Sequence, residues 1–200
     1  MDYAPSIKYF EPEQVEAILA KANSLRDKAL LSVMYQCGLR RAEVQFLTRD
    51  DFNPARGMLR VTRLKKQNSF WHECALWRQT KRLLSQYLAS RTDHHDALFL
   101  GQRGQAIGPE RVYRLFRAAA EAAGITFGET DRRGRRHPSP HRLRHSIAVH
   151  QMNCGIPVED IMEHLAHESM DTTLIYARVL TPRKKKNAMA MESSHHFAKF

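Results

Sequence analysis

Cysteine, long apolar runs and acidic residues are all scarce in this sequence of 200 residues. The three cysteines (Cys37, Cys74 and Cys154) are odd in number and share no close spacing, which favours a reducing compartment over a disulfide framework. No stretch approaches the length of a membrane span, and the start of the chain has no apolar signal region. These absences predict a cytoplasmic or nucleoid-associated protein with no membrane partner.

The sequence also lacks the patterns of two large classes of enzyme site. It contains no Gly-x-x-x-x-Gly-Lys-Ser/Thr loop for nucleotide phosphates, and no His-Glu-x-x-His or close cysteine pair for a metal. Five histidines gather late in the chain without a ligand spacing, and the arginines among them would repel a cation. We therefore expect no metal site and no cofactor. The histidines considered are His141, His145, His150, His164 and His167.

The shortage of acids leaves a strong positive charge. Lysine and arginine number 32 against 21 acids, for a formal net charge of +11, which predicts attraction to polyanions, first nucleic acid and second an anionic membrane. Residues 131–145 hold six arginines and one acid, and residues 183–186 form a second basic run. Either run alone is more often a solvated face or tail than a site, so the charge does not identify a site.

The apolar periodicity predicts a mainly helical α+β fold with one small antiparallel sheet. Residues 58–64 and 70–76 alternate in strand fashion around a polar turn at 65–69. Residues 128–138 are expected to form a basic loop within one domain. A helix is expected to open at residues 10–14, with further helices over about 26–36, 42–47, 79–90, 109–123, 140–153, 158–165 and 171–178.

Arg40 follows Gly38, the residue expected to end the helix at 26–36. A guanidinium that leaves from a fixed turn offers a planar fork to two phosphate oxygens. Glu43, three residues later, is placed to brace it. Taken alone, the pair is better explained as a structural ion pair.

His141 and Arg144 lie three residues apart in the first turn of an expected helix, so they share one face. Pro138 and Pro140 precede them, and the free backbone amides of such a first turn favour an anion. Later in the chain, His167 is followed by Tyr176. The hydroxyl of a tyrosine has a pKa near 10, so it becomes a nucleophile only where positive charge stabilises the phenolate or a base removes its proton.

Together these residues resemble the catalytic domain of the tyrosine recombinases, the phage integrase family. The family's first motif, roughly Thr-Gly-Leu-Arg-x-Ser-Glu, is similar to residues 37–43, and its second, His-x-x-Arg-His, is matched by residues 141–145. Its third motif, Leu-Gly-His followed by Thr-Thr and Tyr, is similar to residues 165–176. The resemblance extends over about residues 11–178.

The resemblance implies that DNA is cleaved and rejoined through a 3′-phosphotyrosyl intermediate. Arg40 and Arg144 would bind the scissile phosphate, Tyr176 would attack it, and His141 and His167 would assist. It also implies a general-acid lysine in the turn of the β-hairpin. Lys66 is the choice, with Lys65 as competitor, because the glycine that commonly follows this lysine in the family is replaced by Gln67.

The resemblance further implies a catalytic domain over residues 1–180 and a tail over 181–200 that docks on a neighbouring protomer, where a disordered tail is the alternative. The implied partners are double-stranded DNA and further copies of the chain as a dimer or tetramer, with room for accessory DNA-bending proteins.

Two other features stay open. The first motif begins before residue 40, without space for the extra N-terminal domain of many family members. This favours the short recombinases of fimbrial phase variation, to which residues 63–66 are also similar, or a catalytic fragment of a larger integrase. The competing functions are a non-catalytic DNA-binding regulator and a type IB topoisomerase-like enzyme.

Overall fold

The computed structural model describes residues 9–64, 70–125, 129–130 and 136–166. The chain divides into two compact units, one of residues 9–147 and a second whose described part is residues 148–166. The predicted division into a domain at 1–180 and a tail at 181–200 stays a prediction.

Helix α1, Pro12–Ala20, begins as the sequence predicts. Glu11 is the N-cap, Pro12 takes the first helical position, and the side chain of Gln14 accepts the backbone N–H of Glu11 at 3.0 Å. Proline costs nothing there, since its missing N–H has no partner in a first turn anyway. Val15 and Ile18 are buried, so α1 presents an apolar stripe to the core.

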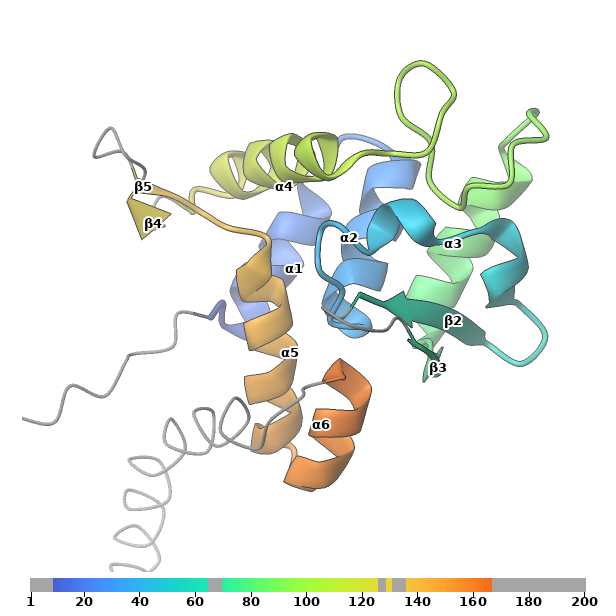
Figure 1. The fold of residues 1–200 in the computed structure, drawn as a ribbon. Helices are drawn as coiled ribbons and strands as arrows, with labels where there is room; N and C mark the ends of the chain where they lie inside the picture. The colour runs from blue at the N-terminus through green and yellow to red at the C-terminus, as the bar shows by residue number, and fades with distance from the viewer. Residues whose placement is uncertain (1–8, 65–69, 126–128, 131–135, 167–200) are drawn as a thin grey trace, which may run out of the picture. The chain divides into compact units, whose positions relative to one another are not determined.

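Helix α2, Leu25–Gln36, is the central helix of this unit and packs against α3, Arg78–Ala89 (Figure 1). The predicted core residues Leu30, Leu31 and Met34 are fully buried. The helix starts at Ser24, whose hydroxyl accepts the backbone N–H of Asp27 at 3.1 Å, a standard N-cap that satisfies one end amide.

The end of α2 is set by Gly38, as predicted. Gly38 has φ of +58°, and its N–H donates to the Tyr35 carbonyl while the N–H of Leu39 donates to that of Met34. This pair of bonds is the Schellman motif, in which glycine occupies the left-handed position without a Cβ clash. The chain therefore leaves α2 at a sharp, hydrogen-bonded turn that leads directly to Arg40.

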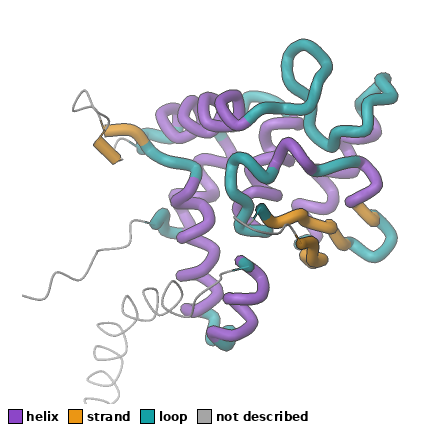
Figure 2. The backbone as a smooth tube through the Cα atoms, in the orientation of Figure 1, coloured by secondary structure: helices purple, strands orange, loops and turns teal. Residues whose placement is uncertain are grey.

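The predicted hairpin is present as β2, Met58–Arg63, and β3, Phe70–Ala75, paired antiparallel with Arg63 opposite Phe70. A two-residue strand, β1 (Phe52–Asn53), adds a third strand that the sequence did not predict. In Figure 2 this sheet is a minor part of a mostly helical unit, which confirms the predicted fold class. The predicted helix at 42–47 is shorter and tighter, a 3₁₀ turn at Val44–Phe46.

The remaining predicted helices form close to their expected bounds. They are α4 at Pro109–Ala122, α5 at His141–Asn153 and α6 at Val158–Leu165. The prediction of a plain loop over 128–138 is wrong in part, because β4 (Glu129–Thr130) pairs with β5 (Arg136–His137). Strands of two residues have no measurable period, so the sequence pattern could not indicate them. The predicted helix at 171–178 lies outside the described residues.

Candidate functional site

Arg40 and Glu43 form the ion pair that their spacing predicts. Arg40 Nη1 lies 3.1 Å from Glu43 Oε1, and the backbone N–H of Arg40 donates to Glu43 Oε2 at 2.8 Å. Arg40 Nη1 also approaches the carbonyl of Leu64 at 3.4 Å. The arginine side chain is 39% exposed, whereas that of Glu43 is fully buried. Glu43 therefore holds Arg40 through its backbone and its guanidinium, and part of the arginine side chain stays accessible to a ligand.

Arg144 reaches the same turn from a distant part of the sequence. Its Nη1 donates to the carbonyl of Gly38 at 2.6 Å, across 106 residues. Arg144 is buried and stands in the first turns of α5. The structure thus brings Arg144 to the turn that carries Arg40, so the two arginines that the sequence selected lie at the same turn.

A third arginine, which was not predicted from the sequence, also contacts this turn. Arg63 ends β2 and is fully buried, with Nη1 3.0 Å from Glu43 Oε2 and Nη2 2.6 Å from the Cys37 carbonyl. A signal existed: strand alternation places Arg63 on the same inward face as Leu59 and Val61. The charge of an arginine usually argues for exposure, which masks this signal in the sequence.

His72 and the two buried cysteines pack next to Arg63. His72 Nε2 lies 3.4 Å from Arg63 Nη2 and 3.3 Å from Cys74 Sγ. A hydrogen bond with Cys74, reinforced by burial, raises the pKa of the Cys37 thiol. This thiol stays protonated and is therefore unsuited to act as a nucleophile.

His141 lies at the start of α5 and is exposed. Its ring packs edge-on against that of His145, with 4.5 Å between the ring centroids. The prediction of free backbone amides in this first turn is wrong. The hydroxyl of Ser139 accepts from His141 N at 3.4 Å, and the carbonyls of Ser139 and Pro140 accept from Arg142 and Leu143. Any anion here must be bound by side chains.

Burial lowers the pKa of His145 to about 4, and the positive neighbours His141, Arg144 and Arg142 act in the same direction. A neutral imidazole is the form favoured in this environment. His145 therefore adds no positive charge near neutral pH, and the cationic character of the cluster comes from the arginines.

The low pKa of His145 makes the stability of the protein depend on pH. Below pH 6.5 the unfolded chain binds a proton at this histidine, while the folded protein does not until about pH 4. Stability should fall across that window, by about 2 kcal/mol from this group at pH 5. The free energy of unfolding can be measured in urea at pH 7 and at pH 5. Its drop between the two pH values should be smaller for His145→Gln than for the wild type, by about that amount. The exposed His94→Gln is the control, and equal losses in the two variants would contradict the assignment.

The remaining predicted site residues lie outside the described residues. They are Lys66 with its competitor Lys65, together with His167 and Tyr176. The tail expected to dock on a neighbour lies outside as well. Their roles stay predictions drawn from the sequence.

Within the part of the chain that the structure describes, no three His, Cys, Asp or Glu side chains are grouped so as to hold a metal ion. Over the same residues, no helix has the length and apolar character needed to cross a membrane.

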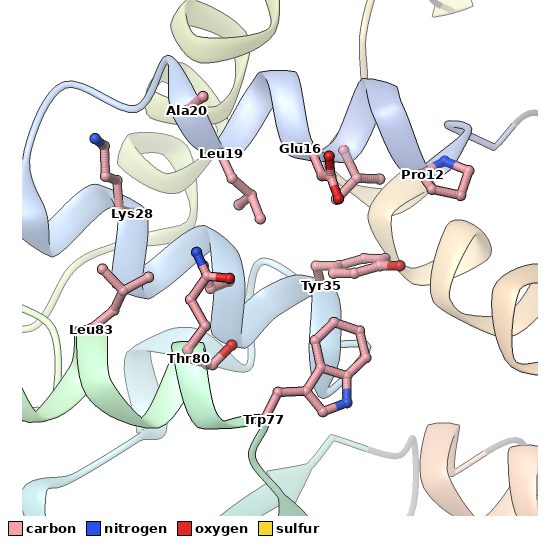
Figure 3. Close-up of a pocket in the computed structure, with 12 residues that line it drawn as sticks. Pro12, Glu16, Leu19, Ala20, Lys28, Tyr35, Trp77, Thr80 and Leu83 are labelled. Atoms are coloured by element: carbon pink, nitrogen blue, oxygen red, sulfur yellow. The ribbon is translucent and has the colours of Figure 1, made fainter.

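A separate hollow of about 620 Å³ lies among α1, α2 and α3. Figure 3 shows Tyr35 and Trp77 on one side of it, where their rings meet edge to face with centroids 5.8 Å apart. None of the residues that line it was predicted as a site residue. The hollow and the arginine cluster are lined by different side chains of α2 and its neighbours.

Comparisons with known proteins agree with the sequence motifs. The model of the phage integrase family matches residues 8–183. The tyrosine recombinase XerC of Corynebacterium glutamicum is 35% identical over 162 residues, which are 80% of this chain and 48% of the relative. The chain therefore spans about half the length of that curated relative.

Solved structures share the fold. The crystal structure of XerA recombinase matches with a TM-score of 0.75 at 23% identity, over 94% of this chain and 64% of that one. The post-cleavage complex of XerH site-specific recombinase with a palindromic difH substrate also gives 0.75, at 22% identity, over 94% and 54% of the two chains. The fold is that of a tyrosine recombinase catalytic domain.

Proposed function

The chain belongs to the phage integrase family, and on that basis we propose that it is a site-specific DNA recombinase that acts through a 3′-phosphotyrosyl intermediate. The observation that carries the proposal is the meeting of Arg40 and Arg144 at the Gly38 turn. Arg40 leaves this turn and Arg144 donates to the Gly38 carbonyl at 2.6 Å, although 106 residues separate the two partners of that bond.

Arg40 and Arg144 would bind the non-bridging oxygens of the scissile phosphate. In the pentacoordinate transition state these oxygens carry more negative charge than in the ground state, so preorganised donors stabilise it selectively. Glu43 keeps Arg40 in place through two contacts, to its guanidinium and to its backbone N–H. These two contacts hold Arg40 in position before the charge develops.

The oxygen of Tyr176 would attack phosphorus, and the bond from phosphorus to the 5′ oxygen would break. Lys66 would give its proton to the leaving 5′ oxygen, while His141 would assist proton transfer at the tyrosine and His167 would hydrogen-bond the phosphate. The phosphotyrosyl ester conserves the energy of the broken phosphodiester. Religation by a 5′ hydroxyl reverses these steps and requires no nucleotide.

The partner proposed is double-stranded DNA, attracted by the net charge of +11. Exchange between two duplexes breaks four strands, and each break needs its own tyrosine. This supports assembly on DNA as a dimer at each site and a tetramer during exchange. Accessory DNA-bending proteins would assist that assembly. We propose that it forms on nucleoid DNA in the cytoplasm. The likeness to the recombinases of phase variation stays a prediction.

The test uses nicked duplex DNA made from the inverted repeats that flank the protein's own gene. A nick close to the scissile phosphate lets the short cleaved fragment diffuse away, so the adduct accumulates. We expect a protein–DNA adduct that survives denaturation, with a free 5′ hydroxyl on the released fragment. Binding without an adduct would favour the non-catalytic regulator. Relaxation of supercoils without strand exchange would favour the topoisomerase-like enzyme.

Lys66 and Lys65 can be separated with a substrate whose leaving 5′ oxygen is replaced by sulfur. A thiol has a far lower pKa than an alcohol, so its departure needs no general acid. We expect Lys66→Ala to cleave the normal substrate poorly and the sulfur substrate at the wild-type rate, with Lys65→Ala close to wild type on both. The reverse pattern would assign the role to Lys65.

A further inference from the structure

Arg63 is a buried arginine for which the proposed chemistry has no direct use. Its side chain is fully buried at the end of β2, and both of its terminal nitrogens bond to groups of the protein. Burial of a guanidinium is costly unless its N–H groups are satisfied. The groups that satisfy it therefore show what Arg63 does in the fold.

Those groups belong to the turn that carries Arg40. Arg63 Nη2 donates to the Cys37 carbonyl at 2.6 Å, and Nη1 approaches the Gly38 carbonyl at 3.3 Å and Glu43 Oε2 at 3.0 Å. The first two acceptors lie at the start of the turn and the third at its end. One planar fork thus ties together both ends of residues 37–43.

Two of the three acceptors that Arg63 holds, the Gly38 carbonyl and the Glu43 carboxylate, are shared with an arginine of the site. The Gly38 carbonyl also accepts from Arg144 Nη1 at 2.6 Å, and the second oxygen of Glu43 binds Arg40 Nη1 at 3.1 Å. Arg40 and Arg63 both contact the Glu43 carboxylate, and Arg144 adds a third guanidinium at the Gly38 carbonyl, so positive charge remains in excess for an anionic ligand. A movement of Arg63 would displace the partners of both other arginines.

The same network reaches the residue that precedes the lysine candidates. The N–H of Leu64 donates to Glu43 Oε1 and its carbonyl accepts from Arg40 Nη1, each at 3.4 Å. Leu64 directly follows Arg63 in the chain. The start of the segment that contains Lys65 and Lys66 is therefore tied to the same carboxylate.

We propose that Arg63 is a positioning residue of the recombinase site, which sets Gly38 and Glu43 where Arg40 and Arg144 require them. This inference rests on the proposed function. An arginine is needed because a rigid fork can meet three acceptors at once, whereas the single ammonium of lysine cannot reproduce that geometry.

The test measures the single-turnover rate of cleavage on a nicked duplex that carries the cognate site. Arg63→Met should cleave about 10- to 100-fold more slowly, a smaller loss than the removal of a direct transition-state donor, with affinity for the DNA nearly unchanged. Arg63→Lys should be intermediate. Arg60→Met is the matched control, because Arg60 lies on the same strand with a half-exposed side chain paired to Asp51, and it should cleave like the wild type.

Two further measurements separate positioning from folding. The variant Arg63→Met with Glu43→Gln strands neither charge of the pair, so it should fold well and still cleave slowly. A substrate with a neutral methylphosphonate at the scissile position carries less negative charge, so its cleavage depends less on the arginines. On that substrate the ratio of wild-type to Arg63→Met rates should shrink severalfold.

A cleavage loss that matches the unfolded fraction of Arg63→Met, or that is equal on both substrates, would overturn the positioning role. Wild-type cleavage with an unimpaired Arg63→Met would overturn this inference alone. If the wild type forms no adduct on any of the flanking repeats, the proposed function falls and the inference falls with it.

Discussion

Tyr176→Phe is expected to abolish the covalent protein–DNA adduct while it leaves DNA binding nearly unchanged. The substitution removes one oxygen and keeps the ring, so packing around residue 176 changes little. Without the hydroxyl there is no atom to form the phosphotyrosyl ester. The measurement is the amount of adduct that survives denaturation on nicked DNA, beside the dissociation constant from a binding titration.

The expectation for Tyr176 follows from the charge of the described site. A phenol with a pKa near 10 is almost fully protonated at neutral pH, and nearby cations favour its ionised form. Arg40 and Arg144 supply such charge where they meet at Gly38. A tyrosine brought to a phosphate held there would be activated by the same groups that stabilise the transition state.

The control for Tyr176 is a second tyrosine of the chain. Tyr113 lies on α4, and its ring lies under the guanidinium of Arg41 at 5.8 Å from the ring centroid. Tyr113→Phe keeps that ring and should form adduct at the wild-type level. An adduct formed by Tyr176→Phe, or lost in Tyr113→Phe, would contradict the assignment of the nucleophile.

The features predicted correctly from the sequence are those with local causes. The end of α2 at Gly38 needs only a residue that accepts a left-handed conformation after an apolar helix. The pairing of Arg40 with Glu43 follows from their separation of three residues. In both cases the interacting groups lie within one turn of each other, so the local pattern contains the necessary information.

The features that the sequence did not predict depend on tertiary contacts. Nothing in the spacing of Arg144 and Gly38 indicates that a side chain and a carbonyl 106 residues apart will meet at 2.6 Å. Arg63 is buried because Glu43, twenty residues earlier, neutralises it, and no local pattern identifies that partner. The amides at the start of α5 were expected to be free, yet Ser139, between two prolines, accepts two of them.

Glu43→Ala is expected to cost about 3–5 kcal/mol in the free energy of unfolding, as for other buried ion pairs that lose one partner. Glu43 and Arg63 are both fully buried, with 3.0 Å between Nη1 and Oε2. Removal of the carboxylate strands a buried cation and takes an acceptor from the backbone N–H of Arg40. Urea unfolding followed by circular dichroism measures the loss, which is a large part of a typical total of about 5–15 kcal/mol.

Glu73→Ala is the matched control for Glu43→Ala, since it also removes the acid of an arginine–glutamate pair. Glu73 pairs with Arg56 at 3.1 Å, but the two side chains are 36% and 62% exposed. Water replaces the lost contact there, so the cost should stay below about 1 kcal/mol. Equal losses of unfolding free energy in the two variants would show that the burial of Glu43 does not raise the cost of removing it.

The combination of Glu43→Ala with Arg63→Met decides what the buried pair contributes. If the cost of Glu43→Ala comes from the stranded cation, removal of Arg63 should recover part of it, and the two changes will be strongly non-additive. Cleavage should not recover, because Arg40 loses the oxygen that holds its guanidinium and Gly38 loses a donor from Arg63. Recovered stability with absent cleavage would separate the two roles of the pair, as a buried charge couple and as the support of Arg40 and Arg144.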